Sequence, residues 1–217
     1  MSIKAAIFDL DGTLLNTYED LANAVNFALR KKSFPEHEAE CYKMFAGNGT
    51  NMMIKRALPE EFRNDQTVEE LKPFYLEYYN KHTGEKTRPY DGIIELIDKL
   101  KSKGIKLAVA SNKIDCMVKQ VVEEYFNGYF DFATGQKEGK RCKPHPDMVL
   151  EAIEALGVSK DEVIYSGDSG VDAETGKNAG IFTVGVLWGF RDADELKKGG
   201  VDVLIEHPSE LLKYIEG

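Results

Sequence analysis

Short apolar segments recur along the chain, and polar residues or glycine bound each of them. Four of these segments are rich in Ile, Val, Ala or Phe and predict buried strands: residues 5–10, 106–110, 163–165 with the approach to Gly167, and 182–186. Two weaker segments, residues 130–134 and 201–205, bring the predicted sheet to about six strands, which is near the usual number.

The segments between these strands carry apolar residues at helical spacing. The clearest patterns cover residues 93–100, 118–125 and 148–156, and the first and last of them stop at Gly104 and Gly157. Helices that alternate with continuously apolar strands predict a parallel sheet covered on both faces. The expected fold class is therefore α/β, with a Rossmann-like, doubly wound parallel sheet as its core.

Residues 16–85 interrupt this alternation, because they contain helical patterns but no convincing strand. Thr17–Asp20 has the form of a capping box, and Thr67–Glu70 opens a second helix. The aromatic stripe of that second helix could stack on a ligand, but packing inside a small helix bundle is the simpler interpretation. We predict an inserted helical cap domain at 16–85 and a core formed by residues 1–15 and 86–217.

The composition limits the classes of protein to which the chain can belong. It has 28 Lys and Arg against 37 Asp and Glu, a net charge of −9, which argues against a nucleic-acid partner. Hydrophobic residues make up 42%, enough for a sizeable core, yet no apolar run approaches the ~18 residues of a membrane helix. The N-terminal apolar run is too short for a secretion signal, so we expect a cytoplasmic protein. Three scattered cysteines predict reduced thiols.

Polar side chains follow three of the predicted strands at the point where each strand ends. The segments are Asp9–Thr13, Ser111–Lys113 and Gly167–Asp172. In an open parallel sheet ligands bind beyond the carboxyl ends of the strands. Each polar residue alone could simply cap the helix that follows, but their coincidence at several strand ends favours a binding site.

Asp9 and Asp11 are two residues apart. In an extended strand their side chains would point to the same side, separated by roughly 6.6 to 6.8 Å. Such a pair suits in-line displacement at phosphorus, because one carboxylate can attack while the other handles the proton of the leaving group. The alternative is an ordinary turn, which Asp11-Gly12 also favours.

The charges of the predicted site require a cation. Asp9, Asp11, Asp168 and Asp172 together with Lys143 leave an excess of three negative charges, which would repel a phosphate. Oxygen ligands without clustered histidines select Mg²⁺, or Mn²⁺ as the alternative, over zinc. We therefore expect a divalent metal at the strand ends.

Lys143 stands beside two prolines in the segment Lys143–Pro146, which stiffens the loop that presents it. A rigidly held lysine can neutralise both Asp9 and the phosphoryl oxygens. Rival phosphate motifs fail: Gly170–Lys177 lacks the spacing of a P-loop, and Gly47–Gly49 is neither preceded by a strand nor completed as G-x-G-x-x-G. Neither a Walker ATPase nor a Rossmann dehydrogenase is indicated.

Four ordered motifs in this chain resemble those of the haloacid dehalogenase superfamily of phosphohydrolases. They are Asp9–Leu14, Ser111–Lys113, Lys143-Pro144, and Gly167–Ser169 with Asp172. The insert looks like the helical cap of that family, and segments 175–180 and 184–189 are similar to its phosphoglycolate phosphatase branch. The resemblance covers nearly the whole chain.

The resemblance implies a role for each motif residue. Asp9 would be the nucleophile, and Asp11 would protonate the leaving alkoxide and then activate water. Ser111 and backbone amides near Leu10, Asp11 and Asn112 would hold the phosphoryl group, and Lys143 would clamp its charge. Because dehalogenating relatives lack the second carboxylate, Asp11 favours phosphate ester hydrolysis.

The same resemblance implies a metal site. Mg²⁺ would take the Asp9 carboxylate, the Asp11 backbone carbonyl and Asp168. For Asp172 two roles stay open, either supporting the metal shell or orienting Lys143.

The cap contributes a candidate specificity loop. Lys43, Lys55 and Arg56 lie along the chain around the flexible Gly47-Asn48-Gly49. We predict that this loop closes over the crevice and meets a carboxylate on the substrate.

These observations predict a Mg²⁺-dependent phosphatase that acts on a small phosphorylated metabolite, with 2-phosphoglycolate as the leading candidate. Alternatives with the same core are a pyrophosphatase, a broad sugar-phosphate phosphatase and a β-phosphoglucomutase-like enzyme. A phosphate-accepting switch module is a rival of another class, but it needs neither Asp11 nor a cap. We expect a monomer or a homodimer.

Overall fold

The computed structural model describes residues Ser2–Ile215. The chain passes twice between two units: a core formed by Met1–Leu15 and Pro89–Gly217, and a cap formed by Asn16–Arg88. The cap predicted at 16–85 extends three residues further in the structure, to Arg88. The connecting segments are the short strands β2 (Leu15–Asn16) and β3 (Arg88–Pro89), which form a two-stranded sheet.

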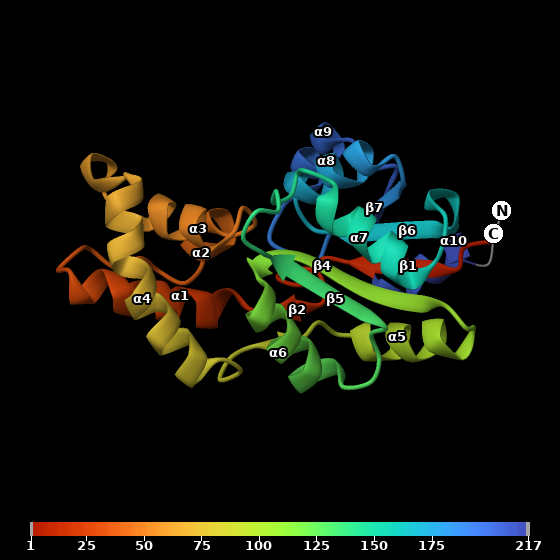
Figure 1. Cartoon of the computed structure of the whole chain (residues 1–217), viewed down its shortest axis with the longest axis horizontal. Coiled ribbons are helices and arrows are strands. Elements are labelled where there is room, and N and C mark those ends of the chain that lie inside the picture. Colours follow the sequence, from red (N-terminus) through yellow and green to blue (C-terminus); the bar gives the residue numbers. More distant parts are fainter. Residues whose placement is uncertain (1, 216–217) are drawn as a thin grey trace. The chain divides into compact units, whose positions relative to one another are not determined.

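The core is built on a six-stranded sheet in the order β5-β4-β1-β6-β7-β8, and every neighbouring pair is parallel (Figure 1). The strands are β1 (Ala5–Phe8), β4 (Lys106–Ile114), β5 (Phe132–Gln136), β6 (Val163–Gly167), β7 (Phe182–Val186) and β8 (Val203–Ile205). This confirms the predicted doubly wound parallel sheet. Because β1 lies between β4 and β6, the three strands whose ends carry polar motifs are neighbours.

Helices cover both faces of this sheet. They are α5 (Ile93–Ser102), α6 (Asp115–Phe126), α7 (Asp147–Leu156), α8 (Gly170–Ala179), α9 (Ala193–Gly199) and α10 (Leu212–Ile215). Successive residues of β1 enter different hydrophobic clusters: Ala6 and Phe8 pack with α5 and α6, and Ala5 and Ile7 pack with α7. Both faces of β1 are therefore buried, which explains its unbroken apolar sequence.

The cap consists of helices α1 (Tyr18–Lys31), α2 (Cys41–Phe45), α3 (Thr50–Ala57) and α4 (Asp65–His82). The aromatic stripe of α4 contributes to the interior of this bundle, since Tyr75 and Tyr79 are buried and their rings stack with centroids 5.6 Å apart. This agrees with the packing interpretation.

The helix starts predicted in the cap were wrong in detail. The Thr17 side chain makes no capping hydrogen bond at α1, because the Asp20 carboxylate accepts from the backbone amides of Gly84, Lys86 and Thr87 instead. Helix α4 begins two residues before Thr67, and Asn64 accepts from the Thr67 amide at 2.9 Å. Partners distant in sequence therefore replaced the local capping box at α1.

Two absences hold for the described part of the chain. None of its helices is long and apolar enough to cross a membrane. Cys41, Cys116 and Cys142 are free thiols, as predicted.

Candidate active site

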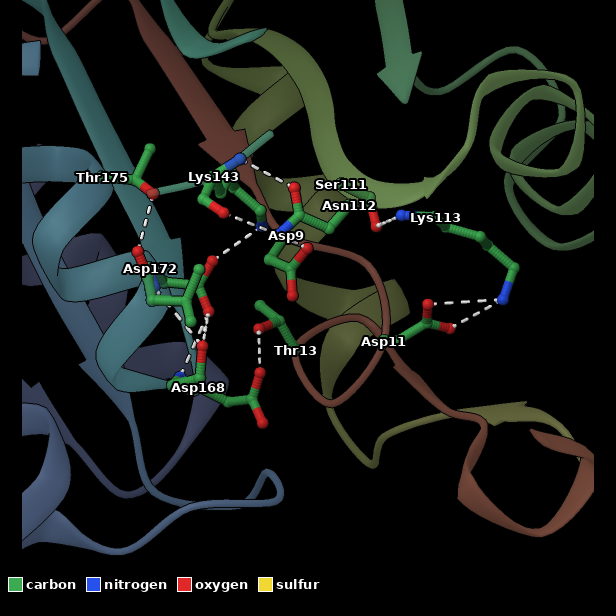
Figure 2. Close-up of polar contacts among 12 residues, drawn as sticks. Asp9, Asp11, Thr13, Ser111, Asn112, Lys113, Lys143, Asp168, Asp172 and Thr175 are labelled. Atoms are coloured by element: carbon green, nitrogen blue, oxygen red, sulfur yellow. Dashed lines mark hydrogen bonds and ion pairs between the residues drawn. The ribbon is translucent and has the colours of Figure 1, made fainter. Parts of the chain in front are cut away.

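The chain turns directly after β1, so the extended geometry predicted for Asp9 and Asp11 was wrong. Strand β1 ends at Phe8, and the Leu10 carbonyl accepts from the amides of Leu14 and Leu15 at 3.0 Å each. The turn brings Gly12 to a φ of +92°, where a Cβ would overlap the Asp168 carboxylate. The alternative that Asp-Gly favours a turn prevailed here. Figure 2 shows the result: the Asp9 carboxylate faces Lys143, and the Asp11 carboxylate faces Lys113.

Three buried carboxylates converge at the strand ends. Asp9 follows β1, Asp168 follows β6 and Asp172 lies in the first turn of α8, and one oxygen of each lies within 4.8 Å of the others. Burial raises the pKa of Asp9 to about 7 in spite of the attraction of Lys143. Burial and the charges of Asp172 and Asp9 raise the pKa of Asp168 well above its usual range. The metal-free site thus carries more negative charge than it can stabilise, so these residues fit a divalent cation.

Lys143 is buried among acceptors that use its three N–H donors. Its Nζ lies 2.6 Å from Asp9 Oδ1 and 2.7 Å from Asp172 Oδ1 (Figure 2). The same atom lies 3.2 Å from the Tyr165 hydroxyl. The side chain of Asn112 holds the backbone of Lys143 at both ends, since it accepts from the Lys143 amide at 2.8 Å and donates to its carbonyl at 3.0 Å. The lysine is therefore fixed by strand β4 as well as by its own loop.

Asp172 uses both of its oxygens within the protein. Oδ1 accepts from Lys143 and from the Tyr165 hydroxyl, each at 2.7 Å. Oδ2 accepts from the Ser169 hydroxyl at 2.6 Å and from its amide at 3.2 Å, which closes a capping box at the start of α8. Of the two roles left open for Asp172, these contacts favour orienting Lys143.

Two further residues of this site, Tyr165 and Lys113, had no predicted role. Tyr165 lies inside the apolar run of β6, where only its hydroxyl distinguished it from a core residue. Lys113 stands in the quoted motif Ser111–Lys113, and its Nζ lies 3.2 and 3.3 Å from the two Asp11 carboxylate oxygens. Strand β4 continues through this motif to Ile114, so Ser111 and Asn112 do not cap α6.

The predicted cap residues belong to the other unit and have partners inside it. Arg56 donates to the Phe45 carbonyl at 2.9 Å and to Asn48 Oδ1 at 2.7 Å, so it holds the loop in which Gly47 and Gly49 adopt positive φ. Lys55 pairs with Asp65 at 2.8 Å, and Lys43 lies 4.3 Å above the ring of Tyr18.

The carboxylates and the buried lysine of this site lie within a stretch of the sequence that matches a known family. The family model of the haloacid dehalogenase-like hydrolases matches residues 6–186. The chain belongs to this family. Membership confirms the resemblance drawn from the four motifs.

Relatives within this family extend over nearly the whole chain. The phosphoglycolate phosphatase of Aquifex aeolicus is 32% identical and aligns over 99% of this chain and 97% of its own length. Pyrophosphatase PpaX of Listeria innocua is 31% identical and aligns over 98% of this chain and 96% of its own length. The N-acetylmuramic acid 6-phosphate phosphatase of Pseudomonas aeruginosa is 30% identical and aligns over 100% of this chain and 96% of its own length.

A solved structure supports the fold in the same way. A protein of Lactobacillus delbrueckii subsp. bulgaricus superposes with a TM-score of 0.93 at 37% identity, covering 99% of each chain. Together with the family match and the phosphatases named above, this identifies the chain as a phosphoric monoester hydrolase of the haloacid dehalogenase-like family.

Replacing Tyr165 with phenylalanine should lower kcat about tenfold with little change in KM, because Lys143 and Asp172 each lose one hydrogen bond worth about 1 kcal/mol. The measurement is steady-state hydrolysis of p-nitrophenyl phosphate as a function of pH. Tyr129→Phe is the matched control, since that hydroxyl bonds Asp98 at the exposed surface. An unchanged kcat and pH profile would show that Tyr165 only fills space.

Proposed function

We propose that this hydrolase converts 2-phosphoglycolate to glycolate and phosphate through an aspartyl phosphate, with Mg²⁺ as cofactor. The observation that carries the chemical part is the placement of Asp9, 2.6 Å from the Lys143 ammonium and grouped with Asp168 and Asp172. The similarity to the Aquifex phosphoglycolate phosphatase supports the substrate.

In the proposed mechanism, a carboxylate oxygen of Asp9 attacks phosphorus while the bond from phosphorus to the leaving oxygen breaks. Asp11 gives its proton to that leaving oxygen. Water then attacks the phosphoryl group on Asp9, the Asp11 carboxylate takes the proton of that water, and the bond between phosphorus and the Asp9 carboxylate breaks. Lys143, Ser111 and the backbone amides near Leu10, Asp11 and Asn112 hold the phosphoryl oxygens in both steps.

The metal would be held by the Asp9 carboxylate, the Asp11 backbone carbonyl and Asp168. When bound, it neutralises the excess carboxylate charge and polarises the phosphoryl group. The oxygen-only donor set favours Mg²⁺, with Mn²⁺ as the alternative. Asp172 would contribute by orienting Lys143, because its own oxygens already accept four hydrogen bonds within the protein.

The three named relatives differ in substrate, but each of those substrates releases a group that carries its own negative charge: glycolate, phosphate and a muramic acid. An acidic small ester is therefore the substrate class we propose. Pyrophosphate is the second candidate, which the Listeria relative favours. A sugar-phosphate phosphatase and a β-phosphoglucomutase-like enzyme remain alternatives.

In the cap, we propose Lys43, Gly47, Asn48, Gly49, Lys55 and Arg56 as substrate-specificity residues. Replacing each of the three cations with alanine should lower kcat/KM more for an acidic ester than for a neutral one. Equal losses on both esters would remove the idea of a carboxylate contact in the cap.

The test of the proposed function is a screen of small phosphate esters, pyrophosphate and glucose phosphates, with Mg²⁺, with Mn²⁺ and with EDTA. The Asp9→Asn variant serves as the blank. We expect metal-dependent phosphate release that is highest for 2-phosphoglycolate. Conversion of a sugar phosphate to its isomer would indicate the mutase, and phosphorylation of Asp9 in stoichiometric amount without turnover would indicate the switch module.

Metal and pH should act together on stability. Because burial raises the pKa of Asp9 from 3.8 to about 7, the folded metal-free protein binds more protons than the unfolded chain between about pH 4 and pH 7. Its free energy of unfolding should therefore fall as pH rises through this window. Burial raises the pKa of Asp172, but the attraction of Lys143 outweighs burial and lowers that pKa below its usual value. The ionised Asp172 therefore stabilises the folded state at neutral pH, and this stabilisation is lost only as pH falls below about 4.

Urea unfolding at about pH 5 and about pH 8, with and without Mg²⁺, measures this effect. We expect Mg²⁺ to stabilise the protein more at the higher pH, where the carboxylates are ionised. Equal stabilisation at both values would contradict the assignment of the cluster as the metal site.

A further inference from the structure

A second buried lysine lies in the core beside the proposed general acid. Lys113 is 5% exposed, and its Nζ approaches both oxygens of the Asp11 carboxylate, at 3.2 and 3.3 Å. Lysine side chains are seldom buried to this degree unless they are paired, and here the partner is the proposed general acid. Neither the proposed mechanism nor the resemblance to the family assigns this lysine a role.

We infer that the Lys113 ammonium binds an anionic group on the leaving group of the substrate, a carboxylate or a second phosphoryl group. This inference deepens the proposed function and rests on it. Lys113 would then be a specificity residue of the core, separate from the cations of the cap.

Strand β4 directs Lys113 toward the reacting centre. The strand runs on to Ile114, and its register with β5 shifts between Ala110 and Ile114. Within this irregular stretch the Lys113 amide donates to Ser111 Oγ at 3.2 Å, and the Lys113 Nζ reaches the Asp11 carboxylate. Figure 2 shows Asp9 between two groups: Lys143 and Asp172 on one side, Asp11 and Lys113 on the other. The two lysines thus serve different parts of the ester.

The side of Asp11 is the side of the leaving group. An oxygen that Asp11 protonates lies at ~2.7 Å from that carboxylate, and therefore within about 6 Å of the Lys113 Nζ. In 2-phosphoglycolate a single methylene group separates the carboxylate from this leaving oxygen. In pyrophosphate the leaving oxygen is bonded directly to the second phosphorus, which carries the anionic oxygens. Either anion can therefore span the remaining distance to the ammonium.

Four other cations of the described chain have partners of their own in the structure. Lys143 contacts Asp9 and Asp172 on the opposite side of the site, and Arg191 pairs with Glu195 at 3.2 Å. In the cap, Lys55 pairs with Asp65, and Arg56 holds backbone carbonyls of its own loop. A negative charge on the leaving group would lie next to Asp11, which becomes negative as it gives its proton to the leaving oxygen, and Lys113 lies beside Asp11 on that side.

The test compares two matched pairs of substrates with the Mg²⁺-loaded enzyme. The first pair is 2-phosphoglycolate and its neutral amide, 2-phosphoglycolamide; the second is pyrophosphate and methyl phosphate. The wild-type enzyme should prefer the anionic member of at least one pair by more than about tenfold in kcat/KM, and the preferred pair identifies carboxylate or phosphoryl as the anion.

In Lys113→Met, activity on both members should fall, because Asp11 also loses its partner. The loss in kcat/KM should be about tenfold or more greater for the anionic member, chiefly through KM, so that the preference largely disappears. Lys113→Arg should restore part of the preference, and it provides a charged variant should the methionine variant fold poorly. Lys119→Met is the matched control, since Lys119 is exposed and pairs with Asp115.

Equal losses on both members of each pair, or a wild-type enzyme without preference, would overturn the inference and leave Lys113 as a positioning residue for Asp11. A wild-type enzyme that hydrolyses none of the four compounds and no other phosphate ester would overturn the proposed function as well. The two failures are therefore distinguishable.

Discussion

Asp9→Asn should lower kcat by at least about 10⁵-fold on every phosphate ester, because the amide cannot attack phosphorus and no neighbouring group can replace it in line. The measurement is phosphate release in the presence of Mg²⁺ together with detection of the phosphorylated protein after rapid acid quench. The wild-type enzyme should yield a phosphorylated species, and the variant should yield none. A variant that kept more than a small percentage of the activity would show that another residue is the nucleophile.

The same variant should remain folded, which makes the loss of activity interpretable. Because burial raises the pKa of Asp9 to about 7, folding without metal disfavours its ionised form relative to the unfolded chain, and asparagine is a neutral residue of nearly the same shape. We expect a melting temperature at about pH 8 that is equal to or above that of the wild type without metal. Asp98→Asn, which changes an exposed acceptor of Tyr129, is the control for the chemical change itself. A sharply lower melting temperature would mean that the pair of Asp9 with Lys143 outweighs the cost of burying the carboxylate.

Lys143→Met should have the largest effect on stability and the second largest on activity. Removal of the ammonium leaves Asp9 and Asp172 buried without their cation, which costs about 3–5 kcal/mol. Burial lowers the pKa of Lys143, but the charges of Asp172 and Asp9 outweigh burial and raise that pKa above its usual value. The substitution therefore removes a positive charge. We expect kcat to fall by about 10³-fold, because the phosphoryl oxygens and the nucleophile lose the same positive charge.

Urea unfolding measures the stability change, with Lys119→Met as an exposed control. Lys143→Arg should rescue neither property, because a planar guanidinium does not fit between three acceptors arranged around a point charge. Mg²⁺ should recover part of the stability of Lys143→Met, since a second cation would again face the carboxylates. A loss below about 1 kcal/mol would show that the ion pairs contribute little beyond their own desolvation.

Much of the fold and of the site was predictable because local patterns carry the information. Unbroken apolar runs such as residues 163–165 are typical of strands buried on both faces, as in a parallel sheet between helices. The polar residues that follow such runs lie at one edge of the sheet whatever the order of the strands. The sequence alone therefore assigns Asp9, Ser111 and Asp168 to one site.

The residues that sequence analysis missed depend on partners far along the chain. Lys113 and Asp11 are 102 residues apart, and their pairing requires that β4 run past its apolar segment and that the chain turn after β1. Tyr165 differs from an ordinary core residue only because Lys143 and Asp172 arrive from other segments. The Asp20 carboxylate accepts hydrogen bonds from the backbone amides of Gly84, Lys86 and Thr87, and therefore does not form the predicted capping box with Thr17.

The sequence by itself determined which segments are strands and helices, which strand ends carry chemistry and what charge the site must balance. Only the tertiary structure decided which way each carboxylate faces and which lysine it meets. The reason is physical: the hydrophobic period of a segment records which of its faces is buried, whereas the direction of a side chain after a strand depends on turns and on contacts between strands that no local period encodes.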